Sequence, residues 1–208
     1  MTQVVLILVV LAPSVILHEV SHGAVALAFG DDTAKRAGRL TLNPVKHIDP
    51  FGTILLPLLL AVTTGAAFGY AKPVPVNPAR MRRPRDHGLL VSLAGPAVNI
   101  VLAVGAALGL RALVTNPALA GIRQGDALLQ ALFAFGWINV ILAAFNLIPL
   151  PPLDGSAVIE RILPRRWLPA WTQLRSYSMG LLLIVVLLLP GALSRVFGVA
   201  LGLWQLLL

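Results

Sequence analysis

The chain contains no cysteine and few charged residues. Its 208 residues include eight Asp and Glu, four His and sixteen Lys and Arg, so only 12% of the chain is charged. The absence of cysteine excludes disulfides, thiolate metal ligands and a thiol nucleophile. Soluble globular domains carry about 25% charged residues. The low charge therefore argues against a soluble domain.

The chain contains several long apolar runs without charged residues. Apolar residues make up 58% of the chain, against about 45–50% in a soluble domain. Several runs reach about twenty residues, the length of a membrane-spanning helix, and lack the alternating character of barrel strands. We therefore predict an all-α polytopic membrane protein that forms one domain over residues 1–208. Its bundle should hold about four to six transmembrane helices.

The apolar runs predict where these helices lie. They should cover residues 3–28, 88–112, 127–148 and 176–190, with a core over 3–160 and C-terminal helices over 176–208. Residues 191–208 contain Arg195 and should lie along the membrane interface or return partway.

Two shorter segments predict irregular structure at the membrane edge. Residues 51–70 are uncharged but broken by proline and glycine, which suits a re-entrant segment buried against protein. A full crossing is the alternative. In residues 39–43, Leu40 and Leu42 alternate with polar side chains, which predicts a strand of a membrane-edge β-hairpin. The proline-rich residues 71–87 should form an extended loop.

The net charge of +8 is concentrated in loops. Lys and Arg gather in residues 30–50, 71–87 and 155–175, whereas the polar link 113–126 holds only Arg123. Because Lys and Arg favour the cytoplasmic side, the three basic loops lie together only if residues 51–70 return without crossing. We expect a multi-pass protein of the bacterial cell membrane, anchored in the lipid bilayer, with no nucleic-acid partner.

Three ionisable residues interrupt the first apolar run. His18-Glu19-Val20-Ser21-His22 follows seventeen uncharged residues and precedes another apolar stretch. On a helix, H-E-x-x-H turns both imidazoles to one side, where they bind a metal, with the glutamate as general base. An ionisable residue at bilayer depth costs about 2.5–3.5 kcal/mol and is usually functional. The pattern predicts one Zn²⁺ per chain.

A catalytic zinc site needs a third protein ligand, and Asp154 is the best candidate. It follows the long apolar run 127–148, within Pro149-Leu150-Pro151-Pro152-Leu153-Asp154-Gly155. The prolines prevent a regular helix and free the aspartate to turn inward. With residues 51–70 re-entrant, the first helix and the 127–148 helix run in the same direction, so His18, His22 and Asp154 can meet.

The two motifs together resemble those of the site-2 proteases, which are intramembrane zinc metalloproteases. His18-Glu19-x-x-His22 and the segment from Asn146 to Gly155 carry the resemblance. Three further segments are similar to compact bacterial members without PDZ-like or nucleotide-sensing domains. They are residues 38–44 with 47–52, residues 71–78 and the run Ala94-Gly95-Pro96-Ala97-Val98-Asn99.

The resemblance implies zinc held by His18, His22 and Asp154, with Glu19 as the general base. It implies regulated cleavage of peptide bonds in or near the transmembrane segment of a membrane-protein substrate, with the active site toward the cytoplasm. Asn146 matches an asparagine that the family is thought to place near the substrate backbone. Capping of the broken helix end is the alternative for Asn146.

Other residues and other functions stay open at this point. Asn99 serves either the site or the packing between helices, and His47 belongs to a structured loop rather than to the metal. Residues 39–43 would accept an unwound substrate by edge addition. A metal transporter and a catalytically inactive membrane-binding module are the rival functions. A transporter needs ligands along a path, and the sequence offers one cluster; a binding module needs no Glu19.

Overall fold

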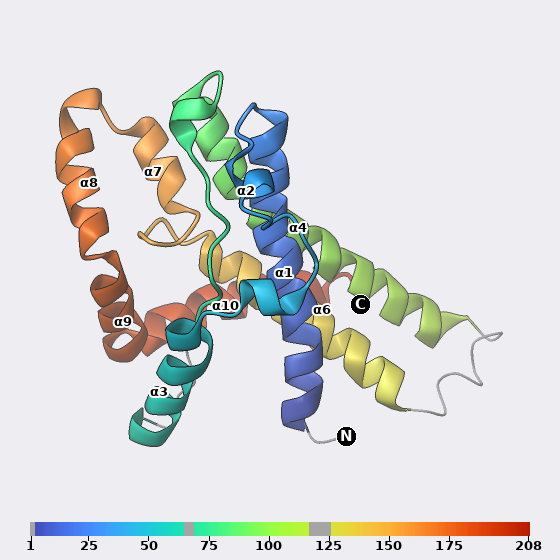
Figure 1. The fold of residues 1–208 in the computed structure, drawn as a ribbon. Coiled ribbons are helices and arrows are strands. Elements are labelled where there is room, and N and C mark those ends of the chain that lie inside the picture. Colours follow the sequence, from blue (N-terminus) through green and yellow to red (C-terminus); the bar gives the residue numbers. More distant parts are fainter. Residues whose placement is uncertain (1–2, 65–68, 117–125) are drawn as a thin grey trace.

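A computed structural model describes residues 3–64, 69–116 and 126–208, and these residues form helices joined by short irregular segments (Figure 1). Three long helices make up the bundle: α1 (Gln3–Ala28), α4 (Pro84–Thr115) and α6 (Asp126–Asn146). Figure 1 shows α1 and α6 running in the same general direction, with α4 opposed to both. The C-terminal ends of α1 and α6 therefore reach the same end of the bundle, as predicted for the metal ligands.

The three bundle helices are long and apolar enough to cross a membrane. A fourth span results if the bent pair that includes α8 (Leu168–Ser176) and α9 (Ser178–Leu188) counts as one. The described residues thus supply three or four candidate spans, against the four to six predicted. The outward surface of the bundle is apolar: Val101 of α4, for example, is 69% exposed. Buried positions instead hold small and polar side chains, among them Ala107, Asn99 and Asn139. This arrangement is typical of helices packed in lipid.

The predicted helices form, with shifted ends. α1 has the predicted bounds, whereas α4 begins at Pro84, four residues before the prediction, because proline fits the first turn of a helix. α6 ends at Asn146, two residues early, ahead of the prolines. The link 117–125 lies outside the described residues.

The predicted β-hairpin is absent from the described residues, and residues 39–43 are irregular. Gly38 takes a left-handed φ of 63°, and the Asn43 side chain accepts a bond from the Val45 N–H to cap η1 (Pro44–His47). The Thr41 carbonyl accepts a bond from His47 Nε2 at 2.9 Å. These local bonds compete with a β-ladder, and two alternating leucines are too few to overcome them.

The described residues 50–64 project away from the bundle (Figure 1). The chain forms η2 (Pro50–Leu55) and α3 (Leu56–Thr64), both short for a span. The Tyr70 N–H then donates to the Gly52 carbonyl at 3.0 Å. Gly52 and Tyr70, on either side of α3 and the undescribed residues 65–68, therefore lie together, as a re-entrant segment requires. The extended loop follows, broken by η3 (Pro78–Arg80).

The C-terminal part is more helical than predicted. The basic segment 155–175 forms α7 (Ser156–Ile162), η5 (Arg165–Trp167) and most of α8. α10 (Pro190–Gln205) returns to the bundle, where Trp204 joins a cluster with Ala103, Ala107, Leu110 and Val140. The Trp204 indole N–H donates to the Ala103 carbonyl at 2.9 Å. A Cβ at Gly136 would lie 2.3 Å from the Trp204 ring, so this glycine makes room for α10 on α6.

Asp31, whose side chain is fully buried, links the segment that follows α1 to the extended loop before α4. Its carboxylate accepts bonds from the Thr33 and Asn77 N–H groups at 3.0 and 2.6 Å. Burial raises the pKa of Asp31, but the Thr33 and Asn77 hydrogen bonds and the Arg80 charge lower it, with a net result below the usual 3.8.

We expect Asp31→Asn to lower the free energy of unfolding by roughly 2 kcal/mol, because hydrogen bonds to a buried charge are lost. Thermal unfolding in detergent at pH 7 measures the change. Asp32→Asn is the control: its carboxylate is 38% exposed and pairs with Arg36 and Arg80, so the change should stay within about 1 kcal/mol. The Asp31 contribution is present above the unfolded pKa of 3.8 and is lost as the pH falls through the lower folded pKa. Equal destabilisation by both variants would contradict this role.

Candidate metal centre and active site

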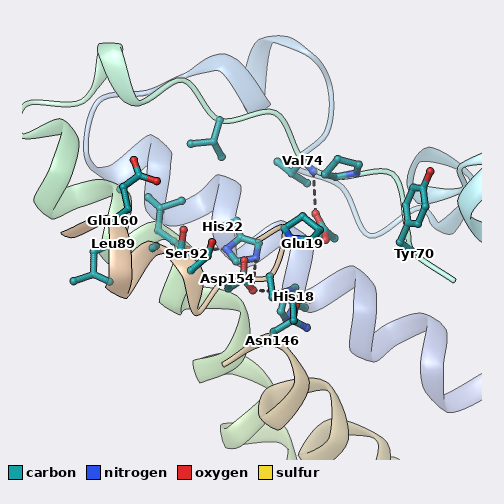
Figure 2. Close-up of a pocket in the computed structure, with 18 of the residues that line it drawn as sticks. His18, Glu19, His22, Tyr70, Val74, Leu89, Ser92, Asn146, Asp154 and Glu160 are labelled. Atoms are coloured by element: carbon teal, nitrogen blue, oxygen red, sulfur yellow. Dashed lines mark hydrogen bonds and ion pairs between the residues drawn. The ribbon is translucent and has the colours of Figure 1, made fainter. Parts of the chain in front are cut away.

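The two histidines of α1 project side by side toward Asp154 (Figure 2). Their ring centroids are 4.7 Å apart, and the rings meet edge to face at 86°. Asp154 Oδ2 lies 3.1 Å from His18 Nε2 and 3.4 Å from His22 Nε2. Within the described residues this is the only group of three or more His, Asp or Glu side chains close enough to hold one metal ion. The structure thus brings together the three ligands predicted from the sequence.

A tight turn after α6 brings Asp154 to the two histidines. The Gly155 N–H donates to the Asn146 carbonyl at 2.6 Å, which folds the chain back on the helix end. A Cβ at Gly155 would lie 2.3 Å from the Leu147 carbonyl oxygen. Only glycine permits this close approach of two backbone segments, and the approach places Asp154 beneath the histidines.

The donor set fits a metal ion. His18 Nδ1 faces Asn99 Oδ1 at 2.5 Å, and His22 Nδ1 faces the Val91 carbonyl at 2.7 Å. Both acceptors require a proton on Nδ1, which leaves a lone pair on each Nε2. Asp154 Oδ2 is buried and has no hydrogen-bond partner among the described residues. Three lone pairs converging on one point repel each other unless a cation lies between them.

The contacts of Asp154 with the two imidazoles agree with a role as a metal ligand. Neither Nε2 carries a proton, so the 3.1 and 3.4 Å contacts with Oδ2 cannot be hydrogen bonds donated by the imidazoles. A carboxylate is the form of Asp154 that binds a divalent metal.

Helix α4 closes the other side of the metal centre through Gly95. A Cβ at this position would lie 2.5 Å from His18 Nε2 and 2.6 Å from His22 Nε2. The missing side chain is what lets α4 pack against both imidazoles. Gly95 belongs to the run that carried the family resemblance, but its contact with the histidines was not predicted.

A cavity of about 750 Å³ opens beside the ligands. His18, Glu19, Asn146 and Asp154 are among the residues that line it, and so are the charged residues Arg85, Glu160, Arg161 and Arg175. Within it, Glu19 Oε2 accepts the Val74 N–H at 2.9 Å, as Figure 2 shows. The extended loop therefore lies against this carboxylate.

Asn146 faces the cavity but also bonds to its own helix. Its side-chain N–H donates to the Leu142 carbonyl at 3.0 Å, as the helix-end alternative predicts. The amide has a second N–H and an oxygen. Figure 2 places Asn146 next to His18 and Asp154.

Other potential ligands have local roles. Buried His47 bonds to the Thr41 carbonyl, as expected of a loop residue. His87 stacks on Phe29, and Asp49 accepts the N–H groups at the start of η2. None of them joins the metal centre.

The sequence prediction overlooked two buried polar residues near the centre, Ser14 and Asn139. Both lie within apolar helices, where a polar side chain is expensive and marks a specific role. That signal was available in the sequence for Asn139, in the middle of the 127–148 run.

Comparison with known proteins decides the family. The sequence model of "Peptidase family M50" matches residues 6–187, most of the chain. The chain belongs to peptidase family M50, the site-2 protease family. The predicted resemblance is thereby confirmed.

Curated relatives agree with the M50 assignment. A Bacillus subtilis protein named "Putative zinc metalloprotease YwhC" is 44% identical over 86% of this chain and 78% of its own length. "Putative zinc metalloprotease Rip2" of Mycolicibacterium smegmatis is 37% identical over 88% of this chain and 66% of its own length. Rip2 of Mycobacterium tuberculosis is 32% identical over 93% and 70%. No solved structure matches significantly.

These findings make zinc the metal of this M50 peptidase, and His18, His22 and Asp154 are the residues that can form its site. The three apolar spans and the family together indicate a membrane protein.

Proposed function

We propose that this M50 peptidase is an intramembrane zinc metalloprotease that hydrolyses peptide bonds in or near the transmembrane segments of other membrane proteins. The observation that carries the proposal is the convergence of His18, His22 and Asp154 beside Glu19, in the wall of one cavity. Zinc, when bound, activates water and polarises the scissile carbonyl.

Glu19 is the proposed general base. It follows His18 directly on α1, and it lines the same cavity. In the reaction, the water oxygen forms a bond to the carbonyl carbon while Glu19 takes the water proton. Glu19 then passes a proton to the leaving amine nitrogen as the C–N bond breaks. The Val74 N–H holds one oxygen of Glu19 in place.

Asn146 is proposed to bind the substrate. One of its amide N–H groups is used by Leu142, and the other is free to donate to the substrate backbone or to the developing oxyanion. This role uses the cavity-facing side of the amide and is compatible with the bond to the helix.

The cavity accounts for water access and for the substrate class. Four charged residues in its wall, Arg85, Glu160, Arg161 and Arg175, provide a polar path toward a site enclosed by apolar helices. A transmembrane substrate must unwind to expose its backbone, so cleavage is expected where a substrate helix is easily opened. The basic loops support an orientation in the cell membrane with the site toward the cytoplasm.

The test is cleavage in liposomes. The purified protein should cut a co-reconstituted single-span substrate in a zinc-dependent manner, and mass spectrometry of the products should place the cut in or beside the span. Zinc uptake into the liposomes without cleavage would support a transporter instead. An intact substrate in the presence of bound zinc would support a binding module.

We expect Val74→Pro to reduce cleavage about tenfold without changing the zinc content. Proline has no N–H, so Glu19 loses a hydrogen bond of roughly 1.5–3 kcal/mol that orients it. Initial cleavage rates measure the effect. Val74→Ala keeps the N–H and should stay near the parent rate; equal rates for the proline and alanine variants would argue against the bond.

A further inference from the structure

A buried chain of polar side chains runs from His18 across all three bundle helices. His18 Nδ1 contacts Asn99 Oδ1 at 2.5 Å, Asn99 Nδ2 contacts Asn139 Oδ1 at 2.7 Å, and Asn139 Nδ2 contacts Ser14 Oγ at 2.9 Å. The side chains of Asn99, Asn139 and Ser14 are fully buried. Such a network is costly among apolar helices unless each donor has an acceptor.

Backbone carbonyls that accept from these side chains fix the direction of every bond in this chain. Ser14 Oγ donates to the Val10 carbonyl at 2.7 Å, and Asn139 Nδ2 donates to the Phe135 carbonyl at 2.8 Å. A carbonyl only accepts, so the Asn139 amide nitrogen must face Phe135 and its oxygen must face Asn99.

The same logic extends to the metal ligand. Because Asn139 presents an oxygen, and the Ser14 backbone carbonyl also accepts from Asn99 Nδ2 at 3.4 Å, Asn99 must turn its amide nitrogen toward both acceptors and its oxygen toward His18. That oxygen accepts only a protonated Nδ1. His18 Nε2 is then left unprotonated, on the side that faces Asp154 at 3.1 Å.

We propose that Asn139, with Ser14, is a positioning residue that fixes the His18 tautomer needed for zinc binding. It acts through Asn99 and touches neither metal nor substrate. The inference rests on the zinc site of the proposed function and adds residues outside that site. Partners beyond the ligand shell hold a metal-binding histidine in the correct tautomer and typically contribute about 10–100-fold in affinity.

The test is zinc affinity of the purified full chain in detergent, measured by chelator competition. Asn139→Ala removes the nearer of the two acceptors that orient the Asn99 amide nitrogen and leaves only the Ser14 carbonyl at 3.4 Å, so the Asn99 amide can rotate and present its nitrogen to His18. We expect affinity to fall about 10–100-fold. Ser14→Ala should cost less, because the Phe135 carbonyl still orients Asn139.

A rescue separates positioning from packing. Asn99→Asp offers His18 a carboxylate, whose two oxygens both accept, so the tautomer no longer depends on Asn139. Adding Asn99→Asp to Asn139→Ala should restore affinity to within about threefold of the parent. Ile138→Ala is the packing control: Ile138 neighbours Asn139 on α6 and is buried without joining the network. It should leave affinity unchanged.

Each outcome has one meaning. Parent-like affinity of Asn139→Ala, or a loss that Asn99→Asp does not rescue, would overturn the inference. Equal losses for Asn139→Ala and Ile138→Ala would assign the effect to packing and would also overturn it. If Asn139→Ala does not fold, the comparison of Ser14→Ala with Ser14→Thr decides: only the alanine variant should lose affinity. Absence of zinc binding by the parent would instead refute the proposed function.

Discussion

Replacement of Glu19 by glutamine should abolish proteolysis while the chain still binds one zinc. The amide keeps the size of the carboxylate and can still contact the water, but it cannot take a proton. General-base catalysis contributes about 10²–10⁴-fold, so cleavage of a reconstituted substrate should fall by at least two orders of magnitude. Glu19 is not among the three ligand residues, which is why zinc content should not change.

Asp86→Asn is the matched control for Glu19→Gln. It neutralises a half-exposed carboxylate that pairs with Arg161 at 2.7 Å. Cleavage by this variant should stay within about twofold, since surface ion pairs contribute little. If Glu19→Gln retained parent activity, another group would have to serve as the base.

Zinc binding should be lost when a single methyl group is added at Gly95. Gly95→Ala would place a Cβ 2.5–2.6 Å from ring atoms of both His18 and His22, so the imidazoles or α4 must move. Alanine favours a helix over glycine by about 1 kcal/mol, so α4 itself should persist. We expect the bound zinc, measured by atomic emission on purified protein, to fall below about one tenth of the parent value, in line with the 10–100-fold effects of misplaced ligands.

Gly105→Ala is the control for this prediction. Gly105 lies on the same helix, and a Cβ there would meet nothing within 4 Å. Its zinc content and thermal stability should match or exceed those of the parent. Normal zinc in Gly95→Ala would mean that the histidines do not depend on close packing with α4.

The metal centre was predictable because its signals are local in sequence. The i, i+4 spacing of His18 and His22 fixes their common face on any helix. The prolines after residue 148 show where α6 must end, and the polar Asp154 follows at once. The basic loops supplied the relative direction of α1 and α6, which Figure 1 shows to be the same.

Contacts between distant segments could not be predicted in this way. The packing of Gly95 on two imidazoles depends on the rotation of α4, which the sequence pattern does not fix. The strand expected at 39–43 failed because η1 and its caps decide the local backbone. Helices α7 and α8 were missed because their basic composition resembles a loop, although residues such as Arg161 pair with Asp86 of α4.

The most direct test of the account is metal depletion and restoration on the reconstituted protein. The parent chain should hold one zinc, lose cleavage of a single-span substrate when a chelator removes the metal, and regain it when zinc is returned. Asp154→Ala should bind little zinc and remain inactive throughout. Folded parent protein that binds no zinc, or that cuts the substrate equally well after the metal is removed, would contradict the account.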